Sequence, residues 1–146
     1  MKPSLPVRSP AVLLIVLLTG LLSFNSCRVV LVDSYDAKIA EQIVETSKEV
    51  DRFYLTMLEH EDRSYAAYSD RYIDIEVELN SLLSKNAARK HNEDTKAICE
   101  RTLTMWQEYK AKHKADGQIS DANVKLNRTF MLDQLNALQQ AENGKQ

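Results

Sequence analysis

Residues that interrupt helices are scarce in this chain. Its 146 residues include three glycines and three prolines, and every proline lies within the first ten positions. So few glycines leave no glycine-rich loop for binding phosphate. Strand-like alternation, internal repeats and low-complexity stretches are also missing, whereas Ala, Leu, Glu, Lys and Gln, which favour helices, are abundant. The composition therefore predicts an all-α protein.

Catalytic and metal-binding motifs are missing as well. No Glu-x-x-His, Cys-x-x-Cys-His or Gly-x-Ser-x-Gly sequence occurs, so the chain lacks the signatures of a di-metal centre, a c-type haem and a serine hydrolase. The histidines His60, His91 and His113 fall at expected helix ends, where we expect them in solvent. We therefore expect no cofactor, no metal and no enzymatic activity.

Basic side chains do not gather anywhere in the sequence. Two of the 19, Lys2 and Arg8, precede Cys27, whereas all 21 acidic side chains follow it. The remaining basic residues are scattered and form no stripe. This distribution excludes the positive footprint that nucleic-acid-binding proteins need.

The N-terminus has the layout of a secretory signal peptide. Residues 1–10 carry Lys2 and Arg8 but no acid, and residues 11–24 are almost wholly apolar. The alternative is a retained membrane-spanning anchor, but this apolar run is shorter than the roughly 20 residues that such a helix needs. Arg28 also prevents its extension. The segment therefore favours export.

The segment Leu22–Cys27 resembles the lipobox of bacterial lipoproteins, in which a cysteine follows a small residue at the end of the apolar run. Phe24 and Asn25 stand where that family usually has Leu and then Ala or Ser. Cleavage by an ordinary signal peptidase after Ser26 fits less well, because bulky Phe24 would occupy a position that needs a small residue. In the family, the cysteine thiol receives a diacylglycerol, the preceding peptide is removed, and the new amino group is acylated.

The resemblance implies an organisation and a location. It implies a signal peptide over residues 1–26, palmitate-type lipidation at Cys27, and a short tether over residues 27–32 that holds the domain to a membrane of the bacterial cell envelope. Arg28 replaces the Asp that retains enteric lipoproteins in the inner membrane. This implies an outer-membrane lipoprotein that faces the periplasm.

Cys99 is the second of the two cysteines. Its neighbours Ile98 and Leu103 place it on a helical apolar face, which favours a buried thiol over a reactive one. A Cys27–Cys99 disulfide is the alternative if Cys27 is not acylated.

Apolar residues recur at helical spacing in four segments, namely 33–60, 62–88, 92–116 and 120–142. Asp33 or Ser34 is expected to cap the first segment and Asn92 the third, which Gly117 ends. The charged cluster after His60 contains neither Gly nor Pro, so a continuous bent helix through it is an alternative to a turn.

Short connections between amphipathic helices predict an antiparallel four-helix bundle over residues 33–142, followed by a polar tail over residues 143–146. The second segment carries a heptad seam whose apolar residues follow at steps of three and four, namely Tyr65, Tyr68, Tyr72, Ile75, Leu79 and Leu82. Such a seam would also serve a homodimer. A long bent hairpin that pairs with a second copy is therefore the alternative architecture.

Aromatic side chains form the candidate binding site. Tyrosine at core positions is unusual because each hydroxyl needs a partner or must reach water. One interpretation is core rings with hydroxyls at the boundary. The other is a groove for a small apolar or peptide ligand, formed by Tyr65, Tyr68, Tyr72, Trp106 and Tyr109.

The sequence therefore predicts a membrane-anchored, non-enzymatic envelope lipoprotein that binds a protein partner as an accessory or assembly factor. A carrier or sensor of a small apolar ligand in the tyrosine-rich groove is the second hypothesis. A structural lipoprotein that associates with itself is the third.

Overall fold

The computed structural model describes residues 33–146, which form four helices: α2 (Ala37–Glu59), α3 (Tyr65–Ala87), α4 (Glu93–Asp116) and α5 (Asp121–Asn143). Within this part of the chain there is no strand, and Ser64 and Gln118 make an isolated bridge. The predicted all-α class is thereby confirmed. The expected signal peptide (1–26) and the tether (27–32) with Cys27 lie outside the described residues.

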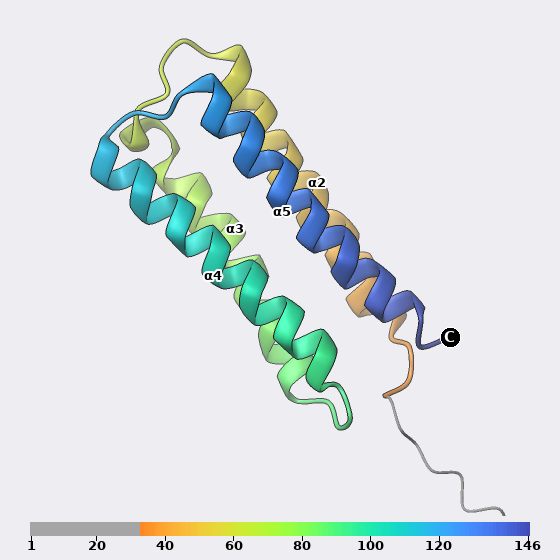
Figure 1. Cartoon of the computed structure of the whole chain (residues 1–146). Helices are drawn as coiled ribbons and strands as arrows, with labels where there is room; N and C mark the ends of the chain where they lie inside the picture. The colour runs from red at the N-terminus through yellow and green to blue at the C-terminus, as the bar shows by residue number, and fades with distance from the viewer. Residues whose placement is uncertain (1–32) are drawn as a thin grey trace, which may run out of the picture. The chain divides into compact units, whose positions relative to one another are not determined.

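The helices form an antiparallel four-helix bundle, as predicted. The backbone of α2 approaches α3 and α5, and that of α4 approaches the same two helices, whereas the diagonal pairs α2–α4 and α3–α5 stay apart. Figure 1 shows α2 beside α5 and α3 beside α4. Short connections reverse the chain between consecutive helices, and this lets each helix bury its apolar stripe against two neighbours. The bent-hairpin alternative is not adopted.

Asp36 caps α2, so the expectation of Asp33 or Ser34 as the cap is wrong. The Asp36 carboxylate accepts hydrogen bonds from the backbone amides of Lys38 (2.8 Å) and Ile39 (3.2 Å). The expected caps belong to an extended segment that precedes the helix. Arg89, which follows α3, binds the carboxylate of Asp33 and the carbonyl of Ser34. The carboxylate of Asp36 therefore satisfies the backbone amides of the first turn of α2.

Two loops meet at the end of the bundle where α2 passes to α3. Ser64 caps α3 through the amide of Ala67 (3.4 Å), and the amide of Tyr65 donates to the carbonyl of Gly117 (3.0 Å). Gly117 ends α4 with a left-handed φ of 73°, as predicted for this glycine. Because His60 is already extended, α2 and α3 are separate helices, and the continuous bent helix is wrong.

The core has a large aromatic cluster and a smaller aliphatic one. The smaller cluster lies where α2 and α4 begin and comprises Ile39, Ile43, Leu82, Cys99 and Leu138. The side chain of Cys99 is buried, as expected. Burial raises the pKa of this thiol to about 12, so it stays protonated and unreactive at neutral pH.

Candidate functional site

The five aromatic residues of the expected groove do not come together in one groove. Tyr68, Tyr72 and Trp106 are buried. Tyr65 and Tyr109 are half-buried, but they lie on different faces: Tyr65 lines a shallow pocket between α3 and α4, and Tyr109 lines one between α4 and α5. The structure thus places three of the five in the core and two on separate surfaces.

The buried rings pack around Phe53 of α2. Its ring centroid lies 5.0 Å from that of Tyr54, 4.7 Å from that of Tyr72 and 5.2 Å from that of Trp106, with the rings edge-on in each pair. Edge-on aromatic pairs contribute about 0.5–1.5 kcal/mol beyond the burial of their area. These ring contacts join α2, α3 and α4 in the core.

His113 is 2% exposed, so the expectation that it lies in solvent is wrong. Its Nε2 lies 2.9 Å from the carbonyl oxygen of Arg63, and its Nδ1 lies 3.1 Å from the hydroxyl of Tyr72. Because a carbonyl oxygen only accepts, Nε2 carries a proton and donates it, and the Tyr72 hydroxyl can donate to Nδ1. His60 and His91 are exposed, as expected. The seven-residue steps from Cys99 to Trp106 to His113 are a signal that the third histidine faces inward.

The opposite end of the bundle contains a buried ionic cluster around Glu142. This side chain, the last residue of the predicted bundle, is fully buried. Its carboxylate accepts hydrogen bonds from Arg89 (3.0 and 3.1 Å), from Lys145 (2.6 Å) and from the backbone amide of Asp36 (2.8 Å). Burial alone would raise the pKa of Glu142, but these hydrogen bonds outweigh burial and hold the pKa below its ordinary value.

Arg89 connects this cluster to the segment that precedes α2. Its Nε lies 2.6 Å from the carboxylate of Asp33, and its guanidinium also donates to the carbonyl of Ser34. The hydrogen bond from Arg89 lowers the pKa of Asp33. The amide of Asp33 donates to the carbonyl of His91 (3.2 Å). Residues 33–36 are therefore fixed to the connection between α3 and α4.

Lys145 completes the ionic cluster. Its side chain, expected in a polar tail, is 3% exposed and donates to the Oδ1 atom of Asn92 (2.6 Å). Asn92 precedes α4 but makes no side-chain cap, contrary to expectation. Its amide nitrogen instead donates to the backbone and side-chain oxygens of Asn86 (3.0 and 2.9 Å). Lys145 and Asn92 are 53 residues apart, so no local sequence pattern relates them.

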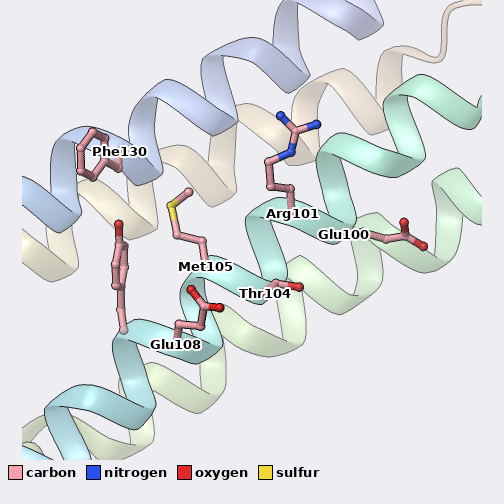
Figure 2. Close-up of a pocket in the computed structure, with 7 residues that line it drawn as sticks. Glu100, Arg101, Thr104, Met105, Glu108 and Phe130 are labelled. Carbon is pink, nitrogen blue, oxygen red and sulfur yellow. The ribbon is translucent and has the colours of Figure 1, made fainter.

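The α4–α5 face carries an open groove of about 650 Å³. Met105 and Tyr109 from α4 and Phe130 from α5 form its apolar centre, and Figure 2 shows Met105 on α4 and Phe130 on α5 at the two sides of the groove. Phe130 is 45% exposed, and Leu126, one turn earlier on α5, is 50% exposed. Tyr109 and Leu126 also line an adjoining pocket of about 210 Å³. The apolar surface thus continues along the seam between the two helices.

Glu100 pairs with Lys96 (3.2 Å), and two further charges of opposite sign lie on α4 beside the centre of this groove. Arg101 and Glu108 both line it, and Figure 2 shows them on either side of Met105. Neither side chain forms an ion pair with any other residue in the described range 33–146. The groove therefore combines an apolar centre with a rim of uncompensated charges, the arrangement typical of protein interfaces.

Metal ligands do not gather in the part of the chain that the structure describes. Among residues 33–146, no group of three His, Cys, Asp or Glu side chains is placed to hold a metal ion. Of the helices α2 to α5, none is both long and apolar enough to cross a membrane.

Two features of the described residues are candidates for a functional role: the α4–α5 groove and the ionic cluster around Glu142. In comparisons with known proteins, no protein-family model, no curated protein and no solved structure matches this chain.

Proposed function

We propose that this chain is a non-enzymatic lipoprotein of the bacterial cell envelope that binds a protein partner through the α4–α5 groove. The layout of residues 1–26 and the cysteine at position 27 support the proposed location in the cell envelope. The apolar centre of the groove, formed by Met105, Tyr109 and Phe130, is the observation that carries the binding role. In this proposal the protein acts as an accessory or assembly factor.

The composition of the groove suits a protein partner. Aromatic side chains and Met are enriched at the centres of protein interfaces, whereas charged side chains remain at the rim. Phe130 and Leu126 are each about half exposed, and covering apolar area of this kind is favourable by roughly 25 cal/mol per Å². Because the groove is open along two helices, an amphipathic helix or a helix face of a partner fits it better than an enclosed small molecule.

The ionic cluster around Glu142 supports a role close to the membrane. Arg89 and Glu142 hold residues 33–36 on the bundle, so only residues 27–32 would separate a lipid at Cys27 from the part of the chain that is held there. An extended segment of this length spans at most ~20 Å. Such a short tether keeps the groove near the membrane surface and raises the effective concentration of partners in the same membrane.

The anchor is tested by replacing Cys27 with Ser in the full-length chain. We expect the wild-type protein to incorporate labelled palmitate and to sediment with membranes, because two or three acyl chains bind a bilayer stably. Cys27→Ser should lose the label and the processing, whereas the control Cys99→Ala should keep both. A Cys27→Ser protein that is membrane-bound, fully processed and free of palmitate contradicts the proposed lipid anchor at Cys27.

The binding face is tested by affinity purification from envelope extracts with the full-length lipidated chain. We expect Phe130→Asp to reduce recovery of a bound protein by roughly tenfold or more, because aromatic anchors dominate interface energies. Ile73→Asp is the matched control, since Ile73 is 51% exposed on α3, away from the groove. Equal recovery with both variants, with both folds intact by circular dichroism, contradicts the proposed face.

A further inference from the structure

The two groove charges that form no ion pair among the described residues, Arg101 and Glu108, are arranged in a self-complementary way. Arg101 and Glu108 lie seven residues apart on α4, which corresponds to about 10.5 Å along a helix. Two turns of helix return nearly to the same face, so both side chains and Met105 between them lie on one side of α4 (Figure 2). A partner helix must present the opposite charge order along this line.

A second α4 that runs antiparallel presents that order. If Arg101 of one copy faces Glu108 of the other, the two-fold axis passes between positions 104 and 105, and the reciprocal pair forms at the same time. A parallel copy would instead place Arg101 beside Arg101 and Glu108 beside Glu108. Like charges directly opposed are unfavourable, so the charge pattern selects the antiparallel arrangement.

The apolar centre of the groove lies near the same two-fold axis. Met105 is adjacent to the axis, and Phe130 lines the same groove from α5 (Figure 2). In an antiparallel pair the exposed rings of Phe130 come close to Met105 of the other copy. The same surface is then used by both copies, as a two-fold interface requires.

We propose that the α4–α5 face binds a second copy of this chain in antiparallel orientation, with reciprocal Arg101–Glu108 ion pairs around a centre formed by Met105 and Phe130. The inference rests on the proposed function and names the partner of that groove. In this dimer the two N-termini lie at opposite ends of helices about 35 Å long. Two lipid anchors on short tethers can then reach one membrane only if the bundles lie along its surface.

Cysteine crosslinking in the full-length lipidated chain in native membranes tests this arrangement. We expect Thr104→Cys to form a disulfide-linked dimer on complete oxidation, because position 104 lies beside the axis. The control is Ala97→Cys, also exposed on α4, whose two copies would be about 22 Å apart, far beyond disulfide reach. No dimer at position 104, or equal dimer at both positions as in a parallel pair, overturns the proposal.

Charge reversal in the Thr104→Cys background tests the ion pairs. We expect Arg101→Glu or Glu108→Arg alone to reduce the crosslinked fraction by roughly tenfold, since each places like charges together. The double variant should restore the dimer, as should co-expression of the two single variants. An unchanged crosslink in the single variants, or no recovery in the double variant, overturns the pairing. A monomeric chain that still captures a different protein in a Phe130-dependent manner overturns this inference but leaves the proposed function standing.

Discussion

The hydroxyl groups of Tyr72 and Tyr54 are both buried in the bundle, but their surroundings differ. Tyr72 lies within hydrogen-bond distance of His113, whereas the Tyr54 hydroxyl has no hydrogen-bond partner among the described residues. Burial raises the pKa of both hydroxyls, so both stay neutral at physiological pH. The two tyrosines therefore form a matched pair in which only the Tyr72 hydroxyl has a hydrogen-bond partner among the described residues.

We expect Tyr72→Phe to lower the free energy of unfolding by about 1–2 kcal/mol, because Nδ1 of His113 loses its partner in a buried site. Tyr54→Phe should have no cost or a small stabilising effect, since it removes a polar group that is buried without compensation. Urea unfolding of the two variants measures the difference. Equal destabilisation of both would show that the contact between Tyr72 and His113 contributes nothing specific.

The inward positions of the bundle could be predicted from sequence better than the polar contacts between helices. The heptad steps of α3 identified Tyr72, Ile75 and Leu79, all of which are buried. The polar contacts of His113 could not be predicted because its partners lie on another helix and in a loop, 41 and 50 residues away. Helical periodicity reports which side of a helix faces inward, but it does not report which polar groups meet there.

At the scale of whole elements, the bounds of the helices follow local sequence except at the end that holds Glu142. Gly117 ends α4 as predicted because its conformation is a local property. The start of α2 is shifted because Arg89 and Glu142 hold residues 33–36 in an extended form. The ionic cluster thus determines where α2 begins.

The ionic cluster makes stability depend on pH in a defined direction. The folded pKa of Glu142 lies below its ordinary value of 4.5, so its contribution is present above about that pH and is lost as the pH falls through the folded pKa. We expect the free energy of unfolding to decline below about pH 4.5. Glu142→Gln should lower it at pH 7 by about 3 kcal/mol, because Arg89 and Lys145 lose their buried counter-charge.

Urea unfolding between pH 3 and pH 7 measures both effects. Glu142→Gln should also flatten the decline at low pH, since the titrating group is gone. Glu59→Gln is a suitable control, because Glu59 is exposed at the end of α2 and its replacement should change stability by less than about 0.5 kcal/mol. Curves for the wild type and Glu142→Gln that run parallel across the whole range would contradict this role of Glu142.

At the scale of the whole molecule, the bundle follows from sequence but the groove does not. Four amphipathic segments with short connections have few ways to bury their apolar faces, and the antiparallel bundle is the simplest. Which aromatic rings remain outside depends on the rotation of each helix within the bundle. Of the predicted site residues, Tyr109 lines the groove, whereas Phe130, which also lines it and stands half exposed, was not among them.

Site-specific photocrosslinking in living cells tests the binding role of the α4–α5 face most directly. A photoreactive phenylalanine analogue is placed at position 130 of the full-length chain, and at position 73 on α3 as the matched exposed control. The α4–α5 face should give a discrete crosslinked protein product, either with a second copy or with another envelope protein, and α3 should give little. No product at position 130, or the same products at both positions, would contradict the claim that this groove is where the protein binds its partner.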